Sequence, residues 1–495
     1  MRTAPVLAGC LWILCASAVP AATPDPAGAA PAIVGRALAP SPLADDLRRL
    51  TDGIGGRVSG SPAMARAVDW GVAAFKAAGV TARAETYTQK VTWAEGATRL
   101  EVLGGTPFPV ALVAEGWSPP TPAGGIEAEL VHVGSGTAAD YAAAGARLRG
   151  SIVLVDSTVT ETWADLFNEY NRTGAIIERA IAAGAKAILW TSARERRLLY
   201  RHTDTVAGEL ASLPMAVVAR EDALRLARVA DAAGQPLRVR FTMPNVIGGP
   251  VEVANVVGEI RGRELPDEFV VLGAHLDSWD LGTGALDNGC NAALVIAAAR
   301  AIRESGYLPR RTIRFVLFSG EEEGMLGSRA YVRQHRAELD RTRAMLAIDS
   351  GIGRITGFQV SGRTDVAATL PKALAGIAAF DASQVLMDGD LGTDNVDFLL
   401  EGVPTLVAAQ DPANYMPNYH AASDTYDKVD LHLLAQHVAI AAATVYGIAE
   451  LDGALAPRQS RAEIASLLER TGLAKEMKES GLWPEWESGQ RGRTP

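Results

Sequence analysis

The sequence has little cysteine, little histidine and no block of basic residues, and each scarcity narrows the classes of protein it can belong to. It contains 3 cysteines and 7 histidines among 495 residues and carries a formal net charge of -10. A small disulfide-held fold needs far more cysteine. A nucleic-acid partner requires a basic, phosphate-neutralising surface, so we expect no nucleic acid to bind. The composition, 48% hydrophobic and 21% charged, is typical of a globular protein.

The amino-terminal residues have the pattern of a removable export signal. The stretch Met1 to Ala22 contains one early arginine, an apolar run from Val6 to Ala18 and then small residues. That run is shorter than the about 20 residues that span a bilayer, which argues against an anchoring helix. We find no other stretch that is long and apolar enough to span one, so we expect no stable membrane insertion. The sequence therefore predicts export to the periplasm or the extracellular space.

The length of the chain and the changes in composition along it predict more than one domain after this signal. A chain of 495 residues exceeds what one hydrophobic core usually organises. An Ala- and Pro-rich stretch predicts a flexible leader, and a region of short strand-like runs without a metal-ligand cluster interrupts the rest. The predicted organisation is 1–22 signal peptide, 23–41 flexible leader, 42–110 first segment of the catalytic domain, 111–244 inserted α/β domain, 245–455 second segment of the catalytic domain and 456–495 carboxyl-terminal tail.

Four apolar, strand-like runs in the second catalytic segment lead to acidic residues or a histidine. The runs cover residues 269–274, 312–318, 344–348 and 405–409, and the segments between them are long enough for crossover helices. Open α/β sheets place their chemistry at the carboxyl ends of such strands, so we expect these side chains to converge. The polar residues that follow the runs are, in chain order, His275, Asp277, Asp287, Glu321, Glu322, Asp349 and His420.

Taken singly, each of these residues has an ordinary structural interpretation. The acidic triplet at 321–323 could begin a helix, where the helix dipole favours carboxylates. Asp349 could cap a helix, and His420 could donate to a backbone carbonyl in a loop. The convergence of four strand ends favours a functional site instead. The histidines outside these motifs are predicted to be structural or surface residues, namely His132, His202, His335, His432 and His437.

Histidines and carboxylates in this order fit a two-zinc hydrolytic site. Amide hydrolysis needs a nucleophile made from water, stabilisation of charge at the carbonyl oxygen and a proton shuttle. Two zinc ions supply the first two, and they need one bridging carboxylate plus a histidine and a carboxylate each. With Asp287 as the bridge, one metal takes His275 and Asp349, and the other takes Glu322 and His420. Ligation by nitrogen and oxygen alone also admits cobalt or manganese.

Two further carboxylates complete this interpretation. Asp277 is placed to orient the imidazole of His275, and Glu321 stays free as a general base that takes a proton from water and returns it to the leaving amine. A Ser/His/Asp hydrolase is the rival mechanism, but the sequence contains no G-x-S-x-G elbow. Cys290 begins a helix-like apolar run and is predicted to be packed rather than to bind metal.

The four motifs resemble those of a known enzyme family. GAHLDSWDLGTGALDNG, FSGEEEGMLGS, AIDSG and YHAASDTYDKVD look like the metal-site motifs of the co-catalytic zinc exopeptidases, the secreted zinc aminopeptidases. The SWD phrase most resembles the carboxypeptidase Q, or plasma glutamate carboxypeptidase, branch. RLRGSIVLVDS and ERAIAAGAKAILWTS in the insertion are similar to the protease-associated domain. The resemblance implies a mixed, mostly parallel sheet with helices on both faces, a protease-associated insertion and two zinc ions per chain.

The resemblance also implies roles for individual residues. By position, the family's catalytic glutamate falls on Glu321, and Asp394 and the segment 414–419 lie where such enzymes shape the substrate pocket. This sequence departs from the branch at two positions. Asn288 stands where the branch often has a second Asp, and Ser350 follows the ligand position Asp349. The ligand positions implied by the family are His275, Asp287, Glu322, Asp349 and His420.

We therefore predict an exported dizinc metallopeptidase that hydrolyses dipeptides or terminal residues of short peptides. The expected chemistry uses a metal-bridging hydroxide with Glu321 as general base. Two alternatives stay open on the sequence: a single-metal amidohydrolase or aminoacyl cyclase, and a non-catalytic, receptor-like binding ectodomain on the same fold. The sequence also leaves open which terminus is cleaved, which side chain is preferred and whether the chain forms a homodimer.

Overall fold

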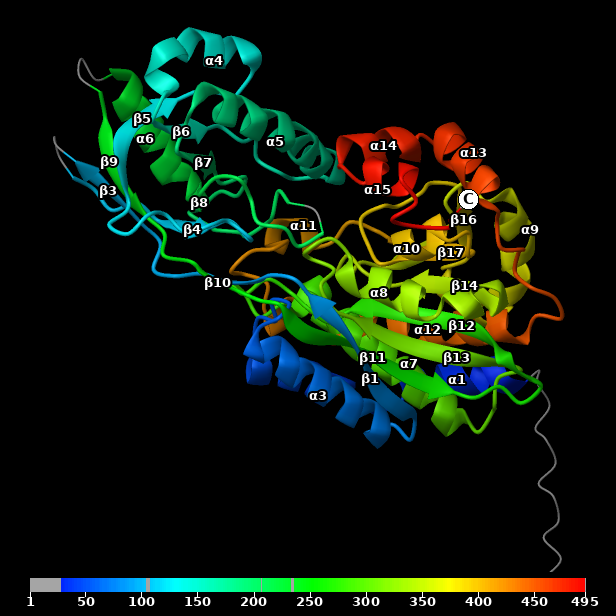
Figure 1. Cartoon of the computed structure of the whole chain (residues 1–495). Coiled ribbons are helices and arrows are strands. Elements are labelled where there is room, and N and C mark those ends of the chain that lie inside the picture. The colour runs from blue at the N-terminus through cyan, green and yellow to red at the C-terminus, as the bar shows by residue number, and fades with distance from the viewer. Residues whose placement is uncertain (1–27, 104–106, 206, 233–235, 495) are drawn as a thin grey trace, which may run out of the picture.

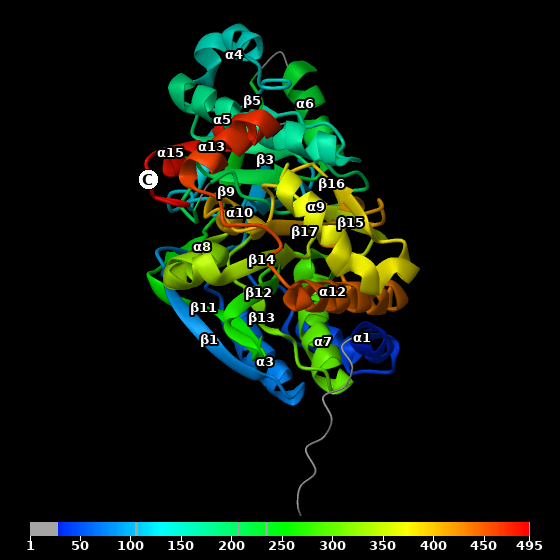
Figure 2. The same cartoon turned by 90° about the vertical axis from the view of Figure 1, so that its right-hand side faces the viewer.

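The computed structural model describes residues 28–494 except 104–106, 206 and 233–235, so the predicted signal peptide at 1–22 lies outside the described residues. Two large sheets organise the chain (Figures 1 and 2). The first has eight strands in the order β1-β11-β13-β12-β14-β17-β15-β16, and the second has seven in the order β3-β9-β5-β6-β7-β8-β4. A short two-stranded sheet of β2 and β10 lies where the chain crosses between them.

The eight-stranded sheet is mixed, with parallel strands at its centre. β13, β12, β14 and β17 are parallel neighbours, whereas β1, β11 and β15 pair antiparallel. The central strands are almost entirely buried and mostly apolar, as expected for parallel strands covered on both faces. The strands are β1 (Thr81–Gln89), β11 (Val251–Ile260), β13 (Arg311–Phe318), β12 (Leu265–His275), β14 (Thr342–Ala347), β17 (Thr405–Gln410), β15 (Ile355–Gln359) and β16 (Gln384–Leu386).

Helices cover both faces of this sheet, as Figure 2 shows. One face packs against α3 (Pro62–Ala77), α7 (Cys290–Ser305) and α12 (Leu431–Glu450) in the main hydrophobic core. The other face packs against α8 (Leu326–Gln334) and α10 (Asn395–Leu400), where Tyr331 and Phe398 meet Phe318. The predicted mixed sheet with helices on both faces is confirmed. The remaining helices of this unit are α2 (Leu43–Arg48), α9 (Thr364–Ala373) and α11 (Tyr415–Asn418).

The seven-stranded sheet forms a second unit with its own apolar core. It begins with β3, which pairs with β9, so the chain enters this sheet before residue 111. That the unit is a protease-associated-like domain stays a prediction. Its elements are β3 (Arg99–Leu103), β4 (Leu112–Ala114), β5 (Ile126–His132), α4 (Ala138–Ala144), β6 (Ile152–Val155), α5 (Trp163–Ala183), β7 (Ala187–Thr191), β8 (Met215–Val218), α6 (Arg220–Ala232) and β9 (Arg238–Thr242), and the crossing strands are β2 (Thr92–Ala94) and β10 (Val246–Gly248).

The prediction of a flexible leader at 23–41 is wrong for the residues of it that the structure describes. Residues 29–38 form a helix, α1 (Ala29–Leu38), in which Ala29, Ile33 and Ala37 are buried. These residues recur every fourth position, so the Ala-rich sequence presents an apolar stripe on a good helix former. The stripe packs against α7 and α12. Composition alone predicts disorder here, because the helices that cover the apolar stripe come from distant parts of the chain.

Helix α12 corrects the expectation that no stretch beyond the signal is long and apolar enough to span a membrane. Among the described residues it is the one helix that meets the length and composition of a span. Its most apolar window is 67% buried inside the protein, and it contacts α1 and α7. An apolar helix that is covered in this way is a core helix.

The carboxyl-terminal tail also packs on the large sheet's unit. Its helices are α13 (Arg461–Thr471), α14 (Leu473–Glu479) and α15 (Trp483–Glu487). Trp486 is buried in a cluster with residues of α10. The guanidinium of Arg491 donates two hydrogen bonds of 2.8 Å to the buried carboxylate of Asp397. This tail is therefore integral to the folded unit.

Substitution of Ile33 tests the packing of α1. Ile33 is fully buried, so Ile33→Ala should lower the free energy of unfolding by about 2–5 kcal/mol through lost burial and a residual cavity. Leu38, in the same helix, is 46% exposed, and Leu38→Ala should change it by no more than about 0.5 kcal/mol. Urea denaturation followed by circular dichroism measures both. Equal, small effects would contradict the packing of α1 on the core.

Candidate metal centre

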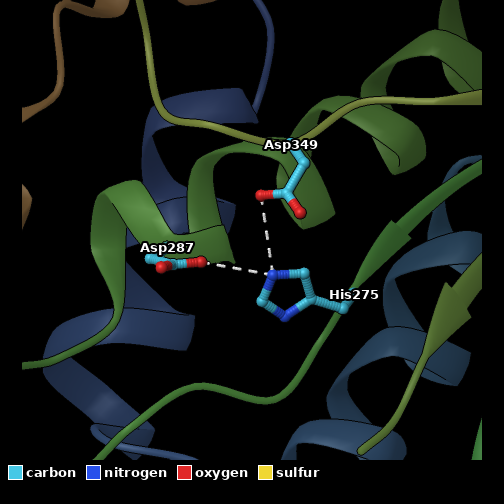
Figure 3. Close-up of side chains that lie close together, drawn as sticks. All are labelled: His275, Asp287 and Asp349. Atoms are coloured by element: carbon cyan, nitrogen blue, oxygen red, sulfur yellow. Dashed lines mark ion pairs between the residues drawn. The ribbon is translucent and has the colours of Figure 1, made fainter. Parts of the chain in front are cut away.

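Three of the predicted side chains meet at the carboxyl ends of the central strands. His275 ends β12, Asp349 follows β14, and Asp287 lies in the tight turn before α7. His275 Nε2 lies 3.2 Å from Asp287 Oδ1 and 3.6 Å from Asp349 Oδ1 (Figure 3). One donor atom from each residue lies within 4.8 Å of the others. We call His275, Asp287 and Asp349 the first trio.

A second trio shares Asp287 with the first. His420 Nε2 lies 3.3 Å from Asp287 Oδ2 and 2.9 Å from Glu322 Oε2. Donor atoms of Asp287, Glu322 and His420 again lie within 4.8 Å of one another, and all three residues are buried. Asp287 thus offers one carboxylate oxygen to each trio. This is the arrangement that a bridging carboxylate between two metal ions requires.

The electrostatics of the trios call for positive charge. Burial opposes ionisation of Asp287, but hydrogen bonds from His275 and His420 outweigh it and lower the pKa of the carboxyl. Burial likewise opposes protonation of His420, yet the charge of Glu322 outweighs it and raises the pKa of the imidazole to about 9. Burial raises the pKa of Glu322. Carboxylates packed this closely are stable only when cations neutralise them.

The donor atoms fit divalent metal ions. Within the described residues, Glu322 Oε1 is buried without a hydrogen-bond partner, which leaves an oxygen free to coordinate. The two trios together supply two imidazoles and three carboxylates, and no thiolate. Nitrogen and oxygen donors of this kind suit zinc and also cobalt or manganese. Each trio leaves positions open, as catalytic sites do and closed structural sites do not.

A buried carboxylate holds the turn that presents Asp287. Asp424 accepts hydrogen bonds from the backbone N–H groups of Ala285 (3.1 Å), Leu286 (2.6 Å) and Asp287 (3.1 Å). Burial raises the pKa of Asp424 to about 7, and these N–H groups favour its charged form. The YHAASDTYDKVD motif therefore contributes both His420 and the support of the opposite loop.

Arg57 supports the same turn from the other side. Its fully buried guanidinium donates to the backbone carbonyls of Leu276 (2.7 Å), Thr283 (2.8 Å) and Gly284 (2.9 Å). Gly284 has φ of 60°, and a Cβ there would lie 2.3 Å from the side chain of Ser278. Only glycine fits such a position without strain. Sequence reasoning did not identify Arg57, because nothing in the sequence near it signals a contact with a loop more than two hundred positions away.

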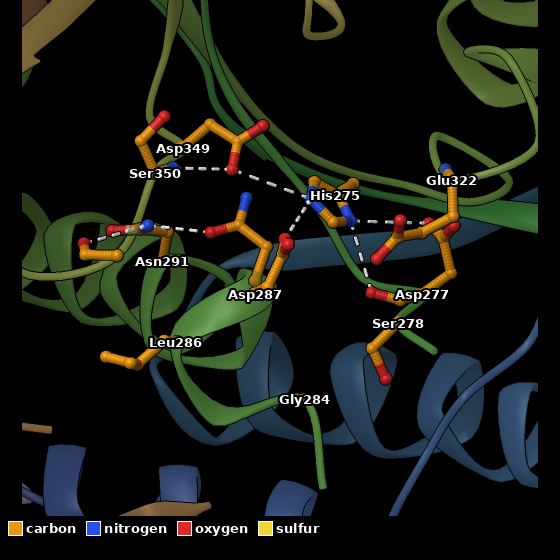
Figure 4. Close-up of polar contacts among 12 residues, drawn as sticks. His275, Asp277, Ser278, Gly284, Leu286, Asp287, Asn291, Glu322, Asp349 and Ser350 are labelled. Carbon is orange, nitrogen blue, oxygen red and sulfur yellow. Dashed lines mark hydrogen bonds and ion pairs between the residues drawn. The ribbon is translucent and has the colours of Figure 1, made fainter. Parts of the chain in front are cut away.

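Asp277 makes a different contact through its carboxylate from the expected one with the imidazole of His275. Its carboxylate accepts the backbone N–H of Glu322 at 3.1 Å, whereas its backbone carbonyl lies 3.1 Å from His275 Nδ1 (Figure 4). The carboxylate itself is farther from that nitrogen, at 3.7 Å. Asp277 therefore connects the first motif to the second, since one residue contacts both a histidine and the backbone of a glutamate.

A cavity opens over both trios. Glu321 lines it without belonging to either trio, and burial raises the pKa of its carboxyl well above the usual range. The seven-stranded unit contributes Trp163 and Tyr170 to the walls, and the loop after β17 contributes Tyr415 and Tyr419. Of the pocket residues expected from the sequence, the segment 414–419 thus reaches the cavity. Asp394 is buried and is not among the residues that line it, and Cys290 is packed in the core.

His202 corrects the prediction that the histidines outside the motifs are structural or surface residues. It lines the cavity from the inserted unit, and its ring stacks on Tyr170 at 4.2 Å and on His420 at 5.7 Å between centroids. Burial lowers the pKa of this imidazole well below its usual value. No motif surrounds His202 in the sequence, and only the docking of the two units brings it to the site. The other four histidines do not line the cavity.

Comparison with known proteins agrees with this geometry. Residues 255–445 match the model of Peptidase family M28. Carboxypeptidase Q of Mus musculus is 28% identical over 81% of this chain and 84% of that protein, and the Homo sapiens protein is 27% identical over 82% and 85%. A Peptidase M28 precursor from Shewanella amazonensis has a similar structure, with a TM-score of 0.78 and 28% identity over 87% of this chain and 98% of that one.

The fold similarity extends further. BSAP, a zinc aminopeptidase from Bacillus subtilis, has a TM-score of 0.66 at 22% identity over 84% of this chain and 97% of that one. The family predicted from the four motifs is confirmed by the family match and by similarity that extends over most of the chain. The segment 255–445 thus matches Peptidase family M28, and the chain as a whole is similar to carboxypeptidase Q.

Proposed function

We propose that this chain is an exported dizinc exopeptidase that hydrolyses dipeptides or the terminal residues of short peptides. The observation that carries the proposal is the pair of trios that share Asp287, each with one histidine and one further carboxylate. His275 and Asp349 would hold one zinc ion, and Glu322 and His420 the other. Export rests on the signal-peptide pattern at 1–22.

The zinc ions, when bound, would polarise the scissile carbonyl and lower the pKa of the attacking water. The chain's own residues then have to move a proton. Glu321 lies at the cavity beside Glu322 and belongs to neither trio, so its carboxylate is free to take the proton from water and to return it to the leaving amine nitrogen. Asp277 keeps Glu322, the neighbour of Glu321, in place by accepting a hydrogen bond from the backbone N–H of Glu322.

The walls of the cavity favour a small substrate with a free amino group. The cavity is a pocket lined by residues of both units, which suits a short peptide rather than a folded chain. The described residues that line it include carboxylates, histidines and aromatic rings but no lysine or arginine that would pair with a free carboxylate. A positively charged terminus is therefore the better match in charge. The rings of Trp163 and Tyr415, which stack at 5.7 Å, offer apolar surface for a side chain.

Metal content and peptide hydrolysis test the proposal directly. The purified chain from residue 23 onward should contain two zinc ions, chelation should abolish hydrolysis of free dipeptides, and added zinc should restore it. Blocking the amino group of the same dipeptides should abolish cleavage. Asp287→Ala should lose both ions, because each trio needs that carboxylate. A chain that binds no metal, or that binds metal without cleaving any peptide, would contradict the proposed function.

Substitution of Glu321 separates proton transfer from metal binding. Glu321→Gln should keep two zinc ions and lower kcat by about 10²–10⁴-fold, because an amide cannot accept the proton. Glu304→Gln, an exposed glutamate at the end of α7, is the matched control and should leave kcat unchanged. Metal analysis and steady-state kinetics on the same preparations provide the comparison. Full turnover in Glu321→Gln would remove this residue as the general base.

Substitution of Asp424 tests the support of the bridging loop. Asp424→Ala removes the acceptor of three backbone N–H groups and should weaken zinc binding by about 10–100-fold, as loss of a group that orients a ligand typically does. Asp427→Ala, three positions away and exposed, should leave binding unchanged. Competition with a chromophoric chelator measures both affinities. Equal affinities in the two variants would show that the loop holds Asp287 without Asp424.

A further inference from the structure

The inserted unit contacts the loop that carries His420 at several points, and these contacts have a consequence for metal binding. We propose that the segment 199–202 of the insertion is a positioning element for His420, and that Arg201 anchors it, so that the second trio depends on the insertion and the first does not. This inference rests on the proposed function, because it concerns how one of the two zinc sites is built.

A backbone bridge joins the insertion to the His420 loop. Tyr200 and Ala421 form an antiparallel bridge. The N–H of Arg201 donates to the carbonyl of His420 at 3.0 Å, and the N–H of Ala422 donates to the carbonyl of Leu199 at 3.2 Å. Hydrogen bonds therefore bracket the bridge on both sides. The chain segment that holds the imidazole is paired with a segment that belongs to the other unit.

His420 needs such support because its backbone is strained. Its φ is 56°, in the left-handed region that residues with a Cβ adopt at a cost. A conformation of this kind persists only where surrounding contacts fix it. Two rings of the insertion add to the backbone contacts, since His202 stacks on His420 and the Tyr170 hydroxyl lies 2.8 Å from the Tyr419 hydroxyl.

Arg201 fixes the insertion segment to both units. Its side chain is 1% exposed, and its guanidinium lies 2.8 Å from Asp280 Oδ1 and 2.5 Å from Glu95 Oε2. It also donates to the carbonyl of Ala114 at 2.9 Å and lies over the ring of Trp93. A buried guanidinium with two carboxylate partners and one carbonyl has few alternative positions. The residue adjacent to the bridge is therefore firmly held.

Asp280 gives the SWD phrase of the first motif a role that the metal ligands do not explain. It lies in the loop between His275 and Asp287, and its carboxylate pairs with Arg201 across the boundary of the two units. Trp279 beside it lies 6.1 Å from the His420 ring, edge to face, and packs on Trp117 of the insertion. Residues 279 and 280 of the first motif thus meet the insertion beside the His420 loop, whereas the turn that carries Asp287 is held by Asp424 and Arg57.

The first trio has a different support. His275 and Asp349 lie directly after β12 and β14, which are adjacent parallel strands in the centre of the large sheet. Their positions follow from the sheet register. Loss of the Arg201 anchor should therefore displace His420 and leave His275 and Asp349 in place. The two halves of the metal centre differ in what holds them.

Zinc binding in single-site backgrounds tests this asymmetry. Asp349→Ala leaves only the second trio complete, and Glu322→Ala leaves only the first. Adding Arg201→Ala should lower zinc affinity by about 10–100-fold in the Asp349→Ala background and leave it unchanged in the Glu322→Ala background. Competition with a chromophoric chelator gives the affinities, zinc alone is the probe, and circular dichroism of the metal-free chains checks that each variant is folded.

Two further variants keep the test decisive if Arg201→Ala fails to fold. Asp280→Asn removes the charge of the partner that Arg201 has in the other unit, and it should weaken zinc binding by the second trio alone. The loss should be smaller than in Arg201→Ala, because Glu95 still pairs with Arg201. Arg240→Ala removes an exposed arginine of the insertion that pairs with Glu101 and Glu127, and it should change neither trio. Equal losses in both backgrounds, or no loss in either, would overturn the inference. An unsubstituted chain that binds no zinc would instead overturn the proposed function on which it rests.

Discussion

Burial of negative charge at one edge of the large sheet is the constraint on which the site depends. Asp287 turns one carboxylate oxygen toward His275 and the other toward His420, and further carboxylates of both trios lie close by. A cluster of this kind is unstable without nearby positive charge and oriented donors. The guanidinium of Arg57 behind the turn supplies positive charge close to these carboxylates, and Asp424 holds the turn by accepting hydrogen bonds from its backbone N–H groups. Burial lowers the pKa of Arg57 to about 10, and the surrounding carboxylates oppose this decrease. Because a pKa of about 10 is still well above 7, the guanidinium stays charged at neutral pH.

The central strands explain why these residues could be predicted from the sequence. Each apolar run is a strand, and the residue types change at the point where the strand leaves the core, as they do after β12 and β14. Parallel register then brings His275 and Asp349 to the same edge without any further information. The family motifs are local for the same reason, since each one is a strand end and the loop that follows it.

The residues that sequence reasoning missed lack such a local signal. The buried stripe of α1 repeats at helical spacing, but its Ala-rich composition is equally that of a linker until α7 and α12 cover it. His202 and Arg201 reach the site only because two sheets dock, and no periodicity within the insertion records that contact. Arg57 lies in a glycine-rich turn far from the loop that it holds. Long-range docking, rather than local propensity, decides these positions.

Docking of the insertion also connects the walls of the cavity with the proposed metal ligands. Trp163 of the insertion stacks on Tyr415, whose hydroxyl donates to Asp287 at 2.9 Å, and Tyr170 contacts Tyr419 beside His420. The same rings therefore border the space for a substrate and touch the residues of the trios. An insertion that served only as a lid could be exchanged or moved without cost to the centre. Here the backbone of the insertion pairs with the loop of His420, so a change in how the units dock would alter the cavity and the second trio together.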